Sequence, residues 1–137
     1  MAIPRRIPVA FADVFPNGAY VLGVEPSNDF EKMRAGAPDP QELDKETGVR
    51  IWAVRIMDAD PTARTAELKV KIAAEVEPVA PDPIPGTPFR PVELVGLLVI
   101  PWVDTNGSRP RQMFALRASG MRPATPLPAR RVQGAAA

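Results

Sequence analysis

The residues best suited to chemistry are cations that alternate with apolar residues along two short stretches of the chain. In residues 68–76 (LKVKIAAEV), Lys69 and Lys71 alternate with aliphatic residues, and this period of two predicts a strand with one buried face. Residues 49–58 (VRIWAVRIMD) carry Arg55 on a face that also bears apolar groups. Such a β-surface suits a single nucleic-acid strand, because phosphates bind cations and bases pack on apolar groups. A plain pair of solvent-exposed strands is the other interpretation.

A second group of cations lies toward the C-terminal end. Residues 1–104 hold 11 basic and 16 acidic side chains, whereas residues 105–137 hold six arginines and no acid. Arginine pairs with phosphate through two parallel N–H donors and also stacks on bases. The other interpretation is a basic stretch that keeps the chain soluble, in a genome whose base composition favours arginine. Three of these arginines, Arg109, Arg111 and Arg117, lie in an expected loop and the strand that follows it. They are candidates together with Trp102, which lies just before the loop.

Aromatic residues for base stacking are few, because the chain has two Trp, one Tyr and five Phe. Trp52 shares the aliphatic face of its stretch, so we expect it in the core. Trp102 lies at a strand end, where partial exposure would let its ring stack on a base. The strand face with the cations also offers Ile51 and Ala53 as apolar contacts. The residues predicted to contact nucleic acid are Arg55, Lys69, Lys71, Trp102, Arg109, Arg111 and Arg117.

The absence of cysteine and histidine excludes several classes of chemistry. Without them there are no disulfides, no thiolate or imidazole zinc ligands, and no Ser–His or Cys–His nucleophilic pair. Asp58 and Asp60 could bind magnesium, but no third ligand accompanies them, and such a pair at the start of a loop favours a turn. We therefore predict a protein that is not an enzyme and has no metal and no cofactor. A metal-dependent nuclease is the enzymatic alternative, and it would rest only on scattered acids.

The 18 prolines and nine glycines favour mainly β structure. Six prolines in residues 78–91 predict an extended connector, the sequence of residues 39–42 (DPQE) predicts one helical turn, and residues 1–16 are expected as an arm or edge strand. This all-β pattern matches a five-stranded OB-like Greek-key barrel, with SH3-like barrels and small sandwiches as alternatives. The five expected strands are residues 19–25, 49–58, 68–76, 92–103 and 112–119.

In such a barrel the binding surface lies across the second and third strands and two flanking loops. We expect residues 1–123 to form this domain, and residues 124–137, a Pro/Ala/Arg stretch without periodicity, to be a disordered tail. No apolar stretch approaches the roughly 20 residues of a membrane span. The N-terminus lacks the apolar centre of a signal peptide. We therefore expect no membrane contact and a cytoplasmic location.

Several stretches of the chain together resemble a known family. They are VAFADVFPNGAYV, DKETGVRIWAVRIMDAD, LKVKIAAE, GTPFRPVELVGL and the closing ALRASGMRP. They resemble small proteins of actinobacterial integrative plasmids and conjugative elements, labelled plasmid replication, integration and excision activators. The similarity spans about residues 9–123 and includes no catalytic signature. It implies a role in the replication of such an element or in its control.

Together, the resemblance and the expected strand order favour a non-catalytic accessory protein for replication or transfer of a plasmid or mobile element. Its expected partners are single-stranded DNA and a replication initiator protein, and we expect it to form a homo-oligomer. The alternative is a regulatory or protein-interaction module that recruits or activates a replication protein without binding single-stranded DNA itself.

Overall fold

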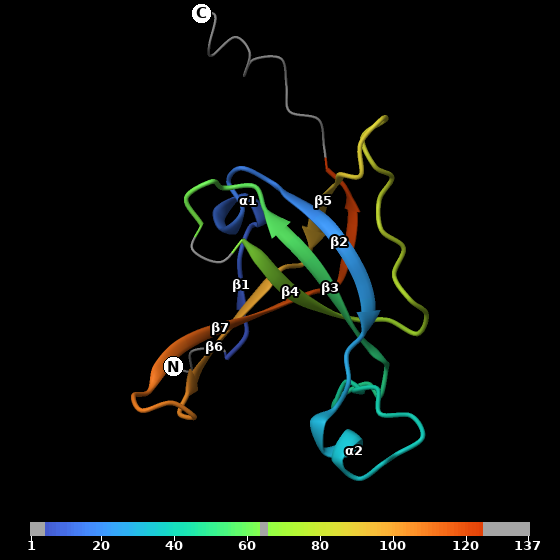
Figure 1. Ribbon diagram of the computed structural model, residues 1–137, viewed down its shortest axis with the longest axis vertical. Helices are drawn as coiled ribbons and strands as arrows, with labels where there is room; N and C mark the ends of the chain where they lie inside the picture. The colour runs from blue at the N-terminus through green and yellow to red at the C-terminus, as the bar shows by residue number, and fades with distance from the viewer. Residues whose placement is uncertain (1–4, 64–65, 125–137) are drawn as a thin grey trace, which may run out of the picture.

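The protein is mostly β in the computed structural model, which describes residues 5–63 and 66–124 (Figure 1). The prediction of an all-β fold is confirmed. The expected tail, residues 124–137, lies outside the described residues except for Ala124. The elements are β1 (Ile7–Pro8), α1 (Phe11–Val14), β2 (Ala19–Pro26), α2 (Phe30–Arg34), β3 (Ile51–Asp58), β4 (Glu67–Ala73), β5 (Arg90–Val95), β6 (Leu98–Asp104), β7 (Arg111–Ala118) and β8 (Gly120–Pro123).

The strands form one curled sheet in the order β1-β6-β7-β4-β3-β2-β5-β8. All neighbours are antiparallel except β4 and β7, which run parallel. The chain between β4 and β5 is the expected extended connector, without helix or strand. Strand β2 pairs with both β3 and β5, so it belongs to both halves of the sheet.

The eight strands exceed the five expected, because the expected strand 92–103 is divided into β5 and β6, β8 follows the expected last strand, and β1 adds a short edge. β5 and β8 pair in the same register as β6 and β7, so these four elements are one long hairpin with a bend. The bend lies at Gly96, whose φ of +64° suits glycine, opposite Ser119. Ser119 donates from both its backbone N–H and its hydroxyl to the Val95 carbonyl oxygen. One half of the hairpin therefore pairs with β2, while the other pairs with β4.

The core lies inside the curl, where alternate residues of the central strands meet. Val70 and Ile72 of β4 are buried while Lys69 and Lys71 point outward, as the period of two predicts. Full burial of each aliphatic or aromatic side chain contributes about 1.5–3 kcal/mol to folding. The remaining core residues are Phe15, Ala19, Val21, Val54, Ile56, Val92, Leu94, Leu97 and Ala118.

The chain between β2 and β3, residues 27–50, carries α2 and projects beyond the ends of these strands, while its Glu42 and Asp44 contact the outer face of the sheet (Figure 1). The predicted helical turn at residues 39–42 is wrong. Gln41 instead forms a bridge with Asn28, because the Glu42 amide donates to the Ser27 carbonyl oxygen at 2.7 Å. The helix forms earlier, where the Asp29 carboxylate caps it by accepting from the first amides of α2. We call residues 27–50 the β2–β3 segment.

Candidate functional site

The strand register brings four of the predicted residues onto one outward face. Arg55 of β3 pairs with Lys69 of β4, and Lys71 of β4 pairs with Arg117 of β7. Directly paired residues point to the same side of a sheet, and so do residues two apart along a strand. These four side chains, which we call the cationic row, therefore cross three strands on the side of the sheet opposite the core.

The same face continues onto the hairpin of β6 and β7, which we call the arm. Leu98 pairs with Arg117, so the period of two places Trp102 and Arg111 on the face of Arg117. Trp102 is 46% exposed. Arg109 is exposed in the loop that joins the two strands. The arm and the β2–β3 segment project at the same end of the molecule, on either side of the sheet (Figure 1).

The outer end of the cationic row is a loose network of charges. Arg55 lies 3.5 Å from Glu25 (Nε to Oε1) and 3.7 Å from Glu67 (Nη1 to Oε2), and the Lys69 Nζ lies 4.0 Å from the same Glu25 oxygen. Gly23, beside a bulge in β2, makes room for Arg55, since a Cβ at this position would lie 2.7 Å from the Arg55 Nη2. Exposed ion pairs of this kind contribute about 0–1 kcal/mol each. These two cations are therefore available to an anionic ligand at little cost.

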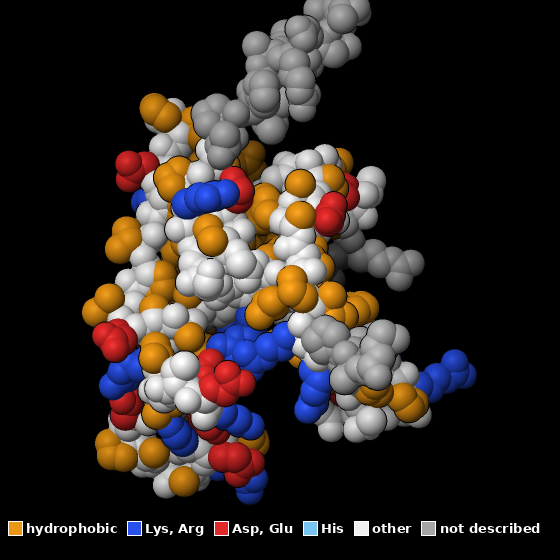
Figure 2. Space-filling model, turned by 180° about the vertical axis from the view of Figure 1, so that it is seen from behind, with side chains coloured by type: hydrophobic (Ala, Val, Ile, Leu, Met, Phe, Trp, Pro, Cys, Tyr) orange, Lys and Arg blue, Asp and Glu red, His pale blue; other side chains and the backbone are white. Residues whose placement is uncertain are grey.

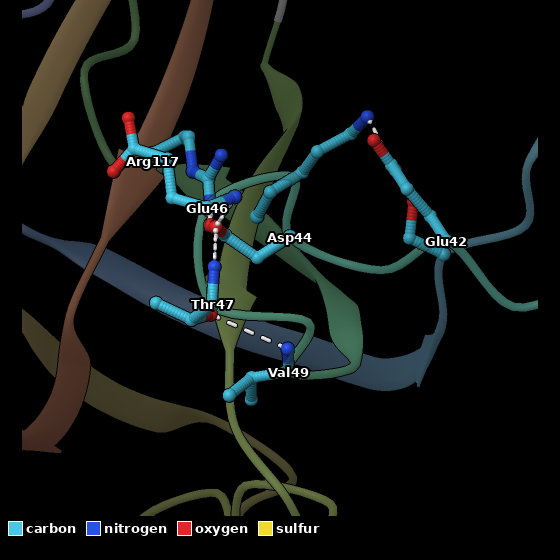
Figure 3. A network of polar contacts seen from close by, with 8 residues as sticks. Glu42, Asp44, Glu46, Thr47, Val49 and Arg117 are labelled. Atoms are coloured by element: carbon cyan, nitrogen blue, oxygen red, sulfur yellow. Dashed lines mark hydrogen bonds and ion pairs between the residues drawn. The ribbon is translucent and has the colours of Figure 1, made fainter.

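The inner end of the row is held much more firmly, by Asp44 (Figure 3). Arg117 Nη2 donates to Asp44 Oδ2 at 2.9 Å, with side chains only 18% and 9% exposed. The other carboxylate oxygen, Oδ1, accepts from the backbone amides of Glu46 and Thr47 at 2.8 and 3.1 Å. The amides of Thr47 and Glu46, together with Arg117, lower the pKa of Asp44 to about 2. Asp44 therefore ties its own loop to β7 as a carboxylate.

Lys71 has a similar partner in the β2–β3 segment. Its Nζ donates to Glu42 Oε1 at 2.9 Å, and the Ser27 hydroxyl donates to the same oxygen at 2.8 Å. Burial favours the protonated form of Glu42, but the hydrogen bonds from Lys71 and Ser27 outweigh it and lower the pKa of Glu42. The two inner cations of the row, Lys71 and Arg117, are therefore paired with Glu42 and Asp44.

The expectation that Ile51 and Ala53 would be exposed is wrong, because they are 1% and 5% exposed. They do lie on the outward face, but the β2–β3 segment covers it there. The Ile51 amide donates to the Glu42 carbonyl oxygen, and the Ser27 amide donates to the Ile51 carbonyl oxygen. The open part of the predicted surface therefore begins at Arg55 and runs along β4 to the arm.

Other residues singled out from the sequence have local roles. Trp52 is half-buried, and its Nε1 donates to the Ala74 carbonyl oxygen at 2.8 Å. Asp58 accepts from the Asp60 amide, and Asp60 accepts from the amide and hydroxyl of Thr62. This is the turn-forming role expected of the two aspartates.

A cavity of about 190 Å³ lies where the β2–β3 segment approaches the base of the arm. Seen from behind, the surface is hollowed between these two projections, with Lys and Arg side chains at the inner end (Figure 2). Sequence reasoning missed Arg6 and Lys45 here, because nothing in their local pattern shows what folds against them. The cavity is lined by Arg6, Glu42, Leu43, Asp44, Lys45, Ile51 and Arg117.

Within residues 5–63 and 66–124, no helix is long and apolar enough to cross a membrane. In the same part of the chain, no group of three acidic side chains lies close enough together to hold a metal ion. Comparison of this chain with protein-family models, with curated proteins and with solved structures found no match.

Proposed function

We propose that this chain is a non-catalytic, cytoplasmic accessory protein that binds single-stranded DNA during replication or transfer of a plasmid or mobile element. The observation that carries the proposal is the register, which gathers Arg55, Lys69, Trp102 and Arg111 from four strands on one face. Cations beside an exposed aromatic ring provide the two kinds of contact that a single strand needs. The plasmid context comes from the sequence resemblance.

We also propose that the curled sheet is a five-stranded OB-like Greek-key barrel, in which β5–β6 and β7–β8 each count as one bent strand. The pairing order supports this: β2 pairs with β3, β3 with β4, β4 with β7, and the bent hairpin returns to β2 through β5. OB-fold barrels bind oligonucleotides on the second and third strands, between the loops that follow the first and fourth strands. Those loops correspond to the β2–β3 segment and the tip of the arm.

In this arrangement a strand of DNA crosses the open part of the face. A base stacks on Trp102, a contact worth about 1–3 kcal/mol, while Arg109 and Arg111 at the arm tip and Lys69 on β4 contact phosphates. Arg111 already lies 3.2 Å from Asp104, but its own side chain is 68% exposed, so it can contact a phosphate as well.

The direct test is the fluorescence anisotropy of labelled dT oligomers titrated with the full chain at two salt concentrations. We expect binding that weakens steeply as salt rises, because each neutralised phosphate releases counterions. Duplex DNA of the same length is the matched control for strand preference. Absence of any dT binding at low salt by the folded protein would refute the proposal.

A specific observation favours the alternative, a module that recruits a replication initiator without binding DNA. On the opposite face of the arm, Val103 and Phe114 are 54% and 62% exposed. Exposed apolar side chains of this size are common in protein interfaces. Binding of the initiator of the same element in nuclease-treated solution, without dT affinity, would select this function. The homo-oligomer stays a prediction, which sedimentation of the purified chain would test.

A further inference from the structure

We propose that the 190 Å³ cavity at the base of the arm is a subsite for one phosphodiester group of the bound strand, contacted by Arg6 and Lys45. This inference rests on the proposed function and adds two residues that it did not include.

Cationic side chains outnumber carboxylates in the lining of the cavity. Arg117 is paired with Asp44, and Glu42 is paired with Lys71 beside it. Arg6 and Lys45 also line the cavity, and no ion pair joins either of them to another residue of the described chain. Two uncompensated cations thus face a polar cavity large enough for a phosphate group.

The backbone is held in place at both of these cations. Arg6 directly precedes β1, whose Ile7 pairs with Val99 at the base of the arm. Lys45 lies in a loop closed by the Asp44 amide, which donates to the Val49 carbonyl oxygen at 2.7 Å. The Asp44 carboxylate docks this loop on Arg117. Two long cationic side chains are therefore anchored beside the same cavity.

The carboxylates in the lining of the cavity determine which kind of phosphate can bind there. Glu42 and Asp44 also line the cavity, and their lowered pKa values keep both ionised. They repel a free phosphate, which carries more than one negative charge at neutral pH. A phosphodiester carries only one, and contacts elsewhere on the face hold it near the cavity. The ligand is therefore a backbone phosphate of a nucleic acid and not free phosphate.

The test compares dT-oligomer binding by the full chain and by the double variant R6A/K45A over a range of salt concentrations. On single strands, each lost phosphate contact lowers the slope of log affinity against log salt by about 0.7. We expect a reduction of about that size, together with severalfold weaker binding at low salt. R5A is the matched control for Arg6, because Arg5 is its exposed neighbour but does not line the cavity.

The outcomes separate this inference from the proposed function. If the wild-type chain binds dT oligomers and R6A/K45A binds with the same slope, the subsite is wrong while the proposed function stands. If the wild-type chain binds no dT, both are wrong. Amide chemical shifts of residues 44–49 supply a second readout: dT should move them in the wild type and not in R6A/K45A. If inorganic phosphate at matched ionic strength moves them as strongly as dT, the ligand is free phosphate and the inference is overturned.

Discussion

Arg117 of β7 and Asp44 of the β2–β3 segment lie 73 positions apart in the sequence, and their side chains meet at 2.9 Å in a mostly covered position. This contact fastens the segment that covers the sheet to the strand that leads into the arm. It therefore sets the spacing between the two projections that flank the candidate site. Asp44 stays ionised because its carboxylate also accepts from two amides of its own loop.

Replacing Asp44 by Asn keeps an oxygen for the loop amides but removes the charge that Arg117 faces. We expect Asp44→Asn to lower the Tm at pH 7, because the guanidinium is left without its counter-charge in a place that water reaches poorly. Thermal unfolding followed by circular dichroism measures the effect. Glu46→Gln removes an exposed carboxylate of the same loop and should leave the Tm nearly unchanged. Equal Tm values for wild type and Asp44→Asn would mean that the ion pair does not stabilise the fold.

The same carboxylate predicts how stability depends on pH. Its pKa is lowered from 3.8 to about 2 by the amides of Thr47 and Glu46 and by Arg117. As pH falls, the unfolded chain takes up this proton before the folded protein does. The stabilisation is therefore complete above about pH 4 and is lost between about pH 4 and about pH 2. The Tm difference between wild type and Asp44→Asn should shrink over that range, and a constant difference would contradict the assignment.

Because the hairpin bends at Gly96, we expect alanine to destabilise the protein more at this position than at Gly36. Both Gly96 and Gly36 have positive φ values, +64° and +70°, so alanine at either position strains the backbone by about 1–2 kcal/mol. At Gly96 the new Cβ would also lie 2.6 Å from Ser119 Oγ, whereas at Gly36 nothing lies within 4 Å. We expect Gly96→Ala to lower the free energy of unfolding more than Gly36→Ala, as measured by urea denaturation. Adding Ser119→Gly to Gly96→Ala should recover part of the difference, and equal losses for the two alanine variants would show that the bend tolerates a side chain.

Sequence patterns predicted what depends on near neighbours along the chain. The alternation around Lys69 and Lys71 gave their outward orientation correctly, because a strand has a strict period of two. The burial of Ile51 could not be predicted, because it depends on a segment whose own pairing is set by contacts with Ser27 and Glu42. The composition shows that acidic residues are plentiful before residue 105. Only the fold shows that the Glu42 carboxylate pairs with the Lys71 ammonium group.

This placement of Glu42 predicts a variant with stronger DNA binding. Glu42→Gln removes the charge that holds Lys71, so Lys71 becomes available to a phosphate on the candidate face. We expect tighter binding of dT oligomers at low salt, and the gain should fade as salt screens the added contact. Glu31→Gln makes the same change in net charge on α2, away from this pair, and is the control. Equal gains in both variants would mean that net charge alone is responsible.

Trp102 is the residue on which the stacking part of the proposal depends. Its ring is exposed on the same face as Arg117, whereas the more exposed Phe114 lies on the opposite face of the arm. Loss of one base stack costs about 1–3 kcal/mol, which corresponds to about 5- to 150-fold in affinity. We therefore expect Trp102→Ala to weaken dT binding by that factor and Phe114→Ala to leave it nearly unchanged. In a Trp52→Phe background, quenching of the remaining tryptophan fluorescence by dT reports the contact directly. Strong dT binding by Trp102→Ala, together with loss of dT binding by Phe114→Ala, would mean that DNA binds the opposite face of the arm. That face carries no residue of the cationic row.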